Sequence, residues 1–290
     1  PNGHFRIGSV TKTFVATVIA QLVDEGELGW DEPIDERLPG VVPDGRHITV
    51  RQLLNHTSGL YDYMHEDGYS TNRWRGPARF DHYEPSELLT VAFAHNPYFA
   101  PGEGWHYSNT NYLVLGELIA GITGAPYGEA VRQRVLEPLR LIDTTVPGDD
   151  PTVPEPHAHG YTTVDGRVRD ATEMNPSLDG AAGEMISTTA DLERFFTALL
   201  SAELTSADSL SQMRAMVDTA TPFDYGLGLQ NFGLPCGREV TGHSGELLGY
   251  TTYVTRDTAG TVVALSFNPG TANLDSEALM SIFDTVYCSP

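Results

Sequence analysis

The chain has 290 residues, 40% of them hydrophobic, so it can bury a substantial core in one or two lobes. Its net charge of −22 argues against nucleic acid and anionic membranes as partners, because both are bound through clustered Lys and Arg. The acidity is typical of a highly soluble protein or of one that prefers cationic or neutral substrates. Its apolar runs are shorter than the roughly 20 residues that cross a bilayer, so no membrane span is expected.

The first half of the chain is predicted to be mainly helical. Apolar residues at three- and four-residue spacing predict a helix over residues 9–25, which Gly26 ends. Prolines interrupt residues 30–60, and residues 61–84 form an aromatic loop. Further helices are expected over residues 48–60 (short, entering a turn), 86–95, 109–122 and 126–138.

The second half of the chain differs in composition and in predicted secondary structure. Residues 144–180 are rich in Pro, Gly and Asp and predict an extended excursion, followed by helices over 189–201 and 206–217. Strands are predicted over residues 225–232, 239–243, 249–256 and 261–268, and an amphipathic helix over 274–287. The order predicts a single α/β (α+β) domain in which an antiparallel sheet is flanked by helices. Its discontinuous α/β lobe would comprise residues 1–30 and 181–290, beside an all-helical lobe of residues 31–180.

The metal-binding residue types do not form a convincing site. Cys236 and Cys288 are too far apart for a CxxC motif, and no His pair completes a zinc tetrahedron with them. A disulfide between the C-terminal tail and a strand region is the first interpretation, and two buried thiols are the alternative. His157 and His159 have a metal-binding spacing, but they lie in a Pro-rich loop without a carboxylate nearby. We expect a structural or solvent-facing role for both histidines and no metal site.

Ser9 and Lys12 are the first candidates for chemistry. They are three residues apart on a predicted helix, so their side chains share one face. A serine hydroxyl needs a base to become a nucleophile, and a lysine with a lowered pKa can act as that base. Taken alone, the pair is better explained by a helix cap at Ser9 and a solvated charge at Lys12.

Two further motifs follow later in the chain. Tyr107 and Asn109 come after a Pro-Gly turn, where a phenol can relay a proton and an amide can orient a carbonyl or a lysine. His243-Ser244-Gly245 is expected at the end of a strand, where Gly245 permits close approach of a substrate. The backbone N–H groups of Ser9 and Glu246 are candidate oxyanion donors. Alone, these motifs are also compatible with a helix cap, a core tyrosine and a surface histidine.

The three motifs occur in the order Ser-x-x-Lys, Tyr-x-Asn and His-Ser-Gly. Stretches such as ITVRQLLNHTSGLYDY (48–63) and YGLGL (225–229) accompany them. Together they make the chain resemble the penicillin-recognising serine hydrolases, which include class C β-lactamases, low-molecular-weight penicillin-binding proteins and related esterases. Among these, the secreted D-alanyl-D-alanine carboxypeptidases of actinomycetes have particularly similar sequence stretches.

The resemblance implies a β-lactamase/transpeptidase-like fold without a cofactor. It implies that Ser9 is the acylated nucleophile, Lys12 the general base, Tyr107 the proton relay and Asn109 an orienting residue, and that His243 supports the Tyr107 hydroxyl electrostatically. It also implies a disulfide between Cys236 and Cys288, and that the family's first helix and first two strands lie upstream of Pro1. The family uses aromatic side chains from the loop after the HTSG stretch, so Tyr69 and Trp74 are expected to line the pocket.

Two residues depart from the carboxypeptidase pattern. Gln230 follows YGLGL where the carboxypeptidases have an arginine that pairs with the substrate carboxylate. Glu246 follows the His-Ser-Gly motif where they have a threonine. We therefore expect Ser244, Gly245, Glu246 and Gln230 to contact a substrate whose terminal carboxylate is disfavoured. Glu246 would bind a substrate ammonium, unless it points to solvent and contributes only its backbone.

The resulting expectation is a secreted, monomeric serine hydrolase that forms an acyl-enzyme. A carboxypeptidase-like activity on small peptides is the first hypothesis, with β-lactams as candidate ligands. The alternatives on the same site are an esterase or a D-stereospecific amino- or endopeptidase or amidase, and after these a β-lactamase. A β-lactam sensor that is acylated without turnover is the alternative from another class of protein.

Overall fold

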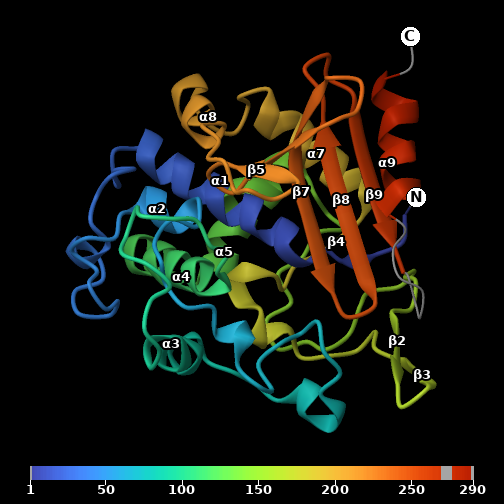
Figure 1. The fold of residues 1–290 in the computed structure, drawn as a ribbon, viewed down its shortest axis with the longest axis horizontal. Helices are drawn as coiled ribbons and strands as arrows, with labels where there is room; N and C mark the ends of the chain where they lie inside the picture. The colour runs from blue at the N-terminus through green and yellow to red at the C-terminus, as the bar shows by residue number, and fades with distance from the viewer. Residues whose placement is uncertain (1, 269–275, 289–290) are drawn as a thin grey trace.

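A computed structural model describes residues 2–268 and 276–288 of the chain. Its main feature is an antiparallel sheet in which each strand pairs with the next along the chain, so the spatial order is the sequence order. The strands are β5 (Phe223–Tyr225), β6 (Gln230–Gly233), β7 (Glu239–Leu247), β8 (Tyr250–Arg256) and β9 (Val262–Phe267). Figure 1 shows this sheet on the side of the molecule that carries the C-terminus.

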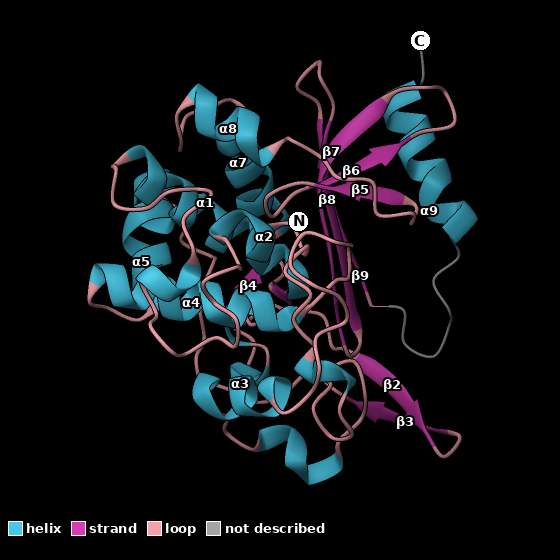
Figure 2. Ribbon diagram, turned by 60° about the vertical axis from the view of Figure 1, so that its left-hand side comes forward, coloured by secondary structure: helices cyan, strands magenta, loops and turns pink. Residues whose placement is uncertain are grey.

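Helices cover both faces of the sheet. On one face, α9 (Ser276–Phe283) packs its Phe283 ring against Tyr253 of β8, with the ring centroids 6.0 Å apart. The other face is covered by α7 (Thr189–Leu200), and the remaining helices lie beyond it (Figure 2). The predicted antiparallel sheet flanked by helices is confirmed.

Helix α1 (Thr11–Asp24) lies in the middle of the molecule. All its residues from Thr11 to Ala20 are buried, and its Phe14 ring stacks on Phe195 of α7 at a centroid distance of 3.7 Å. A helix that is buried all round belongs in the centre of a core. The predicted helix over 9–25 is thus correct in place, but Ser9 itself lies in a preceding 3₁₀ turn (Gly8–Val10).

The other predicted helices are present, most of them shorter than predicted, whereas α4 is one residue longer. They are α2 (Val50–Leu54), α3 (Pro85–Phe93), α4 (Asn109–Thr123), α5 (Tyr127–Val131), α6 (Glu137–Leu139) and α8 (Ala207–Met213). The single helix expected over 126–138 is wrong in detail, because a π-helical turn at Arg132–Leu136 separates α5 from α6. Helix α4 ends at Gly124, whose φ of 71° is the left-handed conformation that glycine adopts without strain.

The single strand predicted over 225–232 is two strands. Between β5 and β6 the chain turns back, and Gly226 N donates to the Leu229 carbonyl at 2.7 Å. This turn presses on α1, since a Cβ on Gly228 would lie 2.4 Å from that of Ala16. Thr13 Oγ1 also donates to the Gly228 carbonyl at 2.8 Å. The YGLGL stretch is therefore a turn packed on the central helix.

The predicted strand over 239–243 is too short. Strand β7 continues to Leu247 because β8 pairs with it along its length, as far as Leu247 opposite Tyr250. His243 therefore lies inside a strand and not at its end, which corrects the sequence-based expectation.

The excursion over residues 144–180 contains a hairpin that the sequence interpretation missed. Strands β2 (Tyr161–Val164) and β3 (Arg167–Asp170) pair around an Asp-Gly turn. The buried guanidinium of Arg6 ties this region down by donating to the carbonyls of Pro151, Thr172 and Met174. Arg6 belongs to β1 (Phe5–Arg6), which pairs with β4 (Ile186–Ser187). Strands of two residues leave no periodic pattern in a sequence.

A disulfide joins Cys236, in the turn between β6 and β7, to Cys288, in the π-helical turn that follows α9. The helix predicted over 274–287 is described from Ser276 onward, so its first two residues lie outside the described part. Within residues 2–268 and 276–288, none of the helices combines the length and the apolar character needed to cross a membrane.

Candidate active site

Ser9 and Lys12 lie side by side where the central helix begins. Ser9 is half-buried in the 3₁₀ turn, and Lys12 is fully buried in the first turn of α1. Lys12 Nζ is 3.1 Å from Ser9 Oγ. The nucleophile candidate is thus reachable from outside, while the amine beside it is shielded from water.

Lys12 has two further partners, and both can only accept hydrogen bonds. Its Nζ is 2.8 Å from Asn109 Oδ1 and 2.7 Å from the Ala182 carbonyl oxygen. Burial lowers the pKa of Lys12 to about 7, so the neutral amine is populated at neutral pH. A neutral amine has two N–H groups and one lone pair. Because the two carbonyl oxygens take both N–H groups, the lone pair faces the hydroxyl of Ser9.

Asp62, a residue to which sequence reasoning gave no role, fixes the orientation of Asn109. Asn109 Nδ2 donates to Asp62 Oδ2 at 2.9 Å, and Met64 N donates to Asp62 Oδ1 at 3.1 Å. A carboxylate oxygen must face the NH₂ side of the amide, so the Asn109 oxygen points to Lys12. Burial raises the pKa of Asp62, and the hydrogen bond from Met64 N opposes this shift.

Tyr107 lies against the same lysine. Its ring centroid is 4.8 Å from Lys12 Nζ. Its hydroxyl is buried and forms no well-aligned hydrogen bond within the described residues. Burial raises the pKa of Tyr107 well above its usual value, and the neighbouring Ser9 side chain partly opposes that effect. The phenol is therefore protonated and faces the nucleophile.

One loop holds the whole segment that carries Tyr107 and Asn109. Side chains and carbonyls of residues 56–63 form hydrogen bonds with residue 106 and with residues 108–111. In addition to the Asp62 contact, Thr110 Oγ1 donates to the Tyr61 carbonyl at 2.6 Å, and Ser58 Oγ donates to Asn111 Oδ1 at 2.7 Å. The signal for this loop in the sequence is a run of polar side chains, Asn55 to Ser58, without a periodic pattern.

His243 is fully buried, and its imidazole contacts Tyr225 and not Tyr107. Tyr225 Oη is 2.8 Å from His243 Nε2, and His243 Nδ1 is 2.6 Å from the Ser244 carbonyl oxygen. The carbonyl only accepts, so Nδ1 carries the proton and Nε2 accepts from the Tyr225 hydroxyl. Burial lowers the pKa of His243 to about 3, so the ring is neutral at pH 7. The expected electrostatic support of the Tyr107 hydroxyl by His243 would therefore have to come from a neutral ring, through Tyr225 rather than by direct contact.

Strand β7 passes directly beside the turn that carries Ser9. A Cβ on Gly245 would lie 2.0 Å from the Ile7 carbonyl oxygen and 3.0 Å from Ser9 N. Glycine is thus required at residue 245 for this approach. Glu246, the next residue, has an exposed side chain. Its negative charge contributes to raising the pKa of Tyr253, after the larger effect of burial.

The remaining substrate-contact candidates, Gln230, Tyr69 and Trp74, contact residues other than Ser9 and Lys12. Gln230 is buried, and its Oε1 accepts from Ser244 N at 2.7 Å and from Ser244 Oγ at 2.9 Å. Tyr69 packs near Tyr83, with ring centroids 5.8 Å apart, and Trp74 lies over the Arg79 guanidinium. Their loop meets the β7–β8 turn, but neither ring has a contact to Ser9 or Lys12 among the described residues.

His159 has a carboxylate partner, contrary to the expectation that no carboxylate lies near it. Its Nδ1 is 2.6 Å from Asp170 Oδ2, because the β2–β3 hairpin returns the chain to it. His157 lies near it, with ring centroids 5.2 Å apart. Cys236, Cys288 and Asp284 also gather within the described residues, but both sulfurs are in the disulfide.

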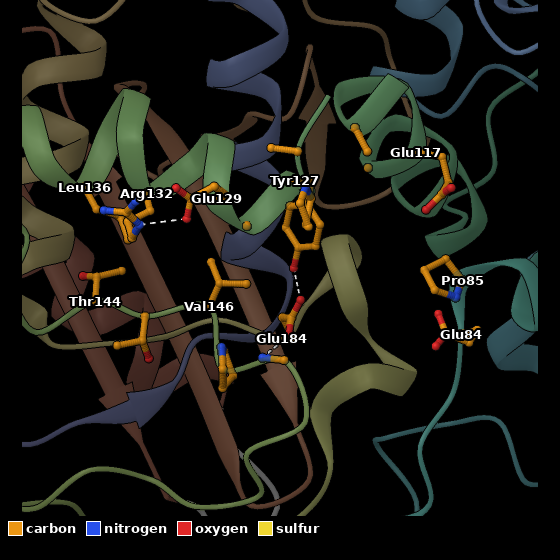
Figure 3. A pocket seen from close by; sticks show the side chains of 18 of the residues that line it. Glu84, Pro85, Glu117, Tyr127, Glu129, Arg132, Leu136, Thr144, Val146 and Glu184 are labelled. Carbon is orange, nitrogen blue, oxygen red and sulfur yellow. Dashed lines mark hydrogen bonds and ion pairs between the residues drawn. The ribbon is translucent and has the colours of Figure 1, made fainter. Parts of the chain in front are cut away.

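A cavity of about 910 Å³ lies away from Ser9, between α4, α5 and residues 144–148. Figure 3 shows Tyr127 pointing to Glu184 inside it. The other oxygen of Glu184 accepts from Gly148 N at 2.9 Å, and burial raises the pKa of this carboxyl to about 7. Among the described residues that line it there is no serine, lysine or cysteine, so these residues do not supply the chemistry of the Ser9 cluster.

The fold and the cluster around Ser9 and Lys12 are those of a serine hydrolase. The chain belongs to the beta-lactamase family, whose family model matches residues 1–284. This confirms the resemblance to penicillin-recognising serine hydrolases and the β-lactamase/transpeptidase-like fold.

The chain is similar to individual proteins that have different activities. It is 41% identical to a D-stereospecific amidohydrolase from Streptomyces sp., covering 100% of this chain and 88% of that one with a TM-score of 0.91. The D-amino acid amidase from Ochrobactrum anthropi SV3, complexed with D-phenylalanine, is 31% identical over 100% of this chain and 86% of its own, with a TM-score of 0.87. Penicillin-binding protein 4* of Bacillus subtilis is 31% identical over 91% of this chain, which spans 61% of that relative's length.

Proposed function

We propose that the protein hydrolyses amide bonds of D-amino acid derivatives through an acyl-enzyme on Ser9. The observation that carries the proposal is the buried Lys12 amine, 3.1 Å from Ser9 Oγ, with its two N–H groups directed to Asn109 and Ala182. In this arrangement the amine takes the hydroxyl proton as Ser9 attacks the carbonyl carbon.

The remaining groups complete an acyl transfer. The N–H groups of Ser9 and Glu246 bind the oxyanion of the tetrahedral intermediate. The protonated Tyr107 hydroxyl, beside Lys12, delivers a proton to the departing amine and is reprotonated by the lysine. Water then attacks the acyl-enzyme, assisted by the same groups acting in reverse order, and the acid product is released.

Substrate charge separates an amidase from a carboxypeptidase. The chain has a neutral amide at Gln230 and a carboxylate at Glu246, so a substrate with a free carboxylate meets no cation there and one like charge. An exposed carboxylate at Glu246 favours a free ammonium group on the substrate. The similarity to a D-stereospecific amidohydrolase and a D-amino acid amidase over the full chain supports the same choice.

A substrate panel tests the proposal. It comprises D-phenylalanine amide, its L-enantiomer, a peptide ending in D-Ala-D-Ala, the C-terminal amide of that peptide and a nitrophenyl ester. We expect the D-amide to be hydrolysed with the highest kcat/KM among the nitrogen-linked substrates and Ser9→Ala to be inactive on all of them. A preference for the free-carboxylate peptide would establish the carboxypeptidase instead, and ester hydrolysis alone would establish the esterase.

Glu246→Gln is the matched variant for the substrate charge. It should raise KM for D-phenylalanine amide and leave the nitrophenyl ester, which has no ammonium, unchanged. The penicillin-binding alternative is tested by incubating the protein with a fluorescent penicillin and measuring its intact mass. A stable adduct without amide turnover would indicate a sensor.

We further propose an extracellular location, which the Cys236–Cys288 disulfide supports because disulfides persist in oxidising compartments.

A further inference from the structure

We propose that His56 is a positioning residue for Tyr107: its neutral imidazole accepts the N–H of the residue that follows Tyr107, and its ring backs the phenol. The inference rests on the proposed function, because His56 acts only through the proton relay. His56 belongs to the HTSG stretch, which the reaction steps above do not use.

The chain on both sides of Tyr107 is bonded to His56. The backbone oxygen of His56 accepts from His106 N at 3.1 Å, and its Nδ1 accepts from Ser108 N at 3.2 Å. Between these two bonds, the rings of His56 and Tyr107 lie with their centroids 4.2 Å apart and their planes 33° from parallel. One residue therefore fixes both the backbone position and the ring plane of the phenol.

The hydrogen bonds specify which nitrogen of His56 carries the proton. Asn111 Nδ2 lies 3.2 Å from His56 Nδ1, and the amide orientation of Asn111 is set by Ser58 Oγ, which donates to its Oδ1. Two donors thus converge on Nδ1, so this nitrogen holds a lone pair and the proton is on Nε2. The Nε2 atom is buried and has no hydrogen-bond partner in the described part of the chain.

The surroundings keep this ring neutral. Burial lowers the pKa of His56 well below its usual value, and the positive charge of Lys12 acts in the same direction. The other groups that face it are His106, His243 and the rings of Trp105, Tyr107, Tyr112 and Tyr225. Protonation would place a hydrogen on Nδ1, opposite the N–H of Ser108, and would push the Tyr107 segment away.

The backbone at His56 suggests the conservative replacement. Its φ is 64°, in the left-handed region, where asparagine is tolerated better than most other residues. The side chain of asparagine also carries an acceptor oxygen in place of Nδ1. His56→Asn should therefore keep part of the clamp, and His56→Ala should lose it.

The choice of leaving group separates positioning of a relay from general loss of structure. An amine leaving group needs the proton from Tyr107, whereas nitrophenolate leaves without one. We expect His56→Ala to lower kcat on D-phenylalanine amide about tenfold more than kcat on the nitrophenyl ester, with little change in KM, and we expect Tyr107→Phe to show the same pattern. His56→Asn should recover part of the amide activity. Phe196→Leu, a core change in α7, is the control that lowers the melting temperature without changing the amide-to-ester ratio.

A second measurement is independent of turnover. Nitrogen-15 NMR of the histidine rings reports the tautomer directly. The signals of His56 are assigned as those missing from the spectrum of His56→Asn. We expect an unprotonated Nδ1 and a protonated Nε2 throughout about pH 5 to 8. Equal loss of amide and ester activity in His56→Ala, a proton on Nδ1, or titration of His56 within this range would overturn the inference. Failure of the proposed function would instead appear as an unchanged amide-to-ester ratio in Tyr107→Phe, with the NMR result unaffected.

Discussion

Gly8 and Glu246 touch through their backbones. A Cβ on Gly8 would lie 2.7 Å from the carbonyl oxygen of Glu246 and 2.8 Å from its nitrogen, and Gly8 has a φ of 50°. This contact brings the residue before the nucleophile against the strand at the point where the second oxyanion donor is expected. The spacing between the N–H groups of Ser9 and Glu246 therefore depends on glycine at residue 8.

Gly8→Ala should widen that spacing. Loss of an oxyanion donor typically costs about 10²–10³-fold in kcat, so we expect a decrease of this size on amide and ester alike. The matched control is Gly26→Ala, which has the same kind of backbone, with a φ of 77°, but open space around the added carbon. This control should lose stability and keep its activity. Full activity in Gly8→Ala would contradict the assignment of the oxyanion site.

Lys12 should govern the acidic side of the pH–rate profile. Its pKa is lowered to about 7, and only the neutral amine accepts the Ser9 proton. We expect kcat/KM to rise with pH and to level off above about pH 7, and Lys12→Arg to be inactive. Because burial lowers the pKa of His243 to about 3, that ring should add no inflection between about pH 5 and 8. A profile that is flat through pH 7 would exclude Lys12 as the base.

Asp62→Asn should move that inflection to lower pH. The negative charge of Asp62 raises the pKa of Lys12 against the effect of burial, so its removal lowers that pKa further. Activity at the plateau should also fall, because an asparagine cannot accept from both Met64 N and Asn109 Nδ2. Asp179→Asn is the control, since Asp179 also raises the pKa of Lys12 but makes no contact with Asn109 that the structure describes. An unchanged inflection in both variants would contradict this view.

Glu184 should make the protein less stable as the pH rises. Burial raises its pKa from 4.5 to about 7, so the folded state holds this proton more tightly than the unfolded state. The stabilisation is complete below about pH 4.5 and is lost as the pH rises through about 7, in total about 3 kcal/mol. In Glu184→Gln, urea unfolding at pH 5 and pH 8 should give free energies that differ less than in the wild type. Glu193→Gln, at an exposed position of α7, is the control and should retain the wild-type difference.

Removal of the disulfide should destabilise the protein without changing its chemistry. The bond closes a loop of 52 residues, for which chain entropy predicts a loss of about 4 kcal/mol in the free energy of unfolding. The Cys236→Ser/Cys288→Ser double variant should unfold at lower urea and keep its kcat at room temperature. A melting temperature unaffected by the double substitution or by reductant would argue against a stabilising role.

The nucleophile and base were predictable because their relationship is local. Ser9 and Lys12 are one helical turn apart, and the periodicity of the following apolar residues predicts that helix. Strands β8 and β9 were predictable because their β-branched and aromatic residues lie between Gly and Asp turns. The fold was expected from these elements together with the family resemblance.

The rest of the site depends on long-range contacts that leave no local pattern. Asp62 and His56 are polar residues in a loop, and only the fold reveals that they bond Asn109 and Ser108. The extent of β7 was underestimated because Gly245 weakens a strand pattern, although here the glycine permits contact with the nucleophile turn. Gly228 splits a predicted strand for a similar reason, since its turn packs on α1.

The dependence of residues 106–111 on the loop 56–63 also bears on how the protein fails when heated. Both segments lie outside the main sheet, and they are joined by individual hydrogen bonds and by the packing of the His56 and Tyr107 rings. Local opening of such a loop requires less free energy than unfolding of the sheet and central helix. We therefore expect inactivation to begin at temperatures where the circular dichroism of the helices is still intact. The operational lifetime of the enzyme would then be extended more by stiffening this loop than by improving its core.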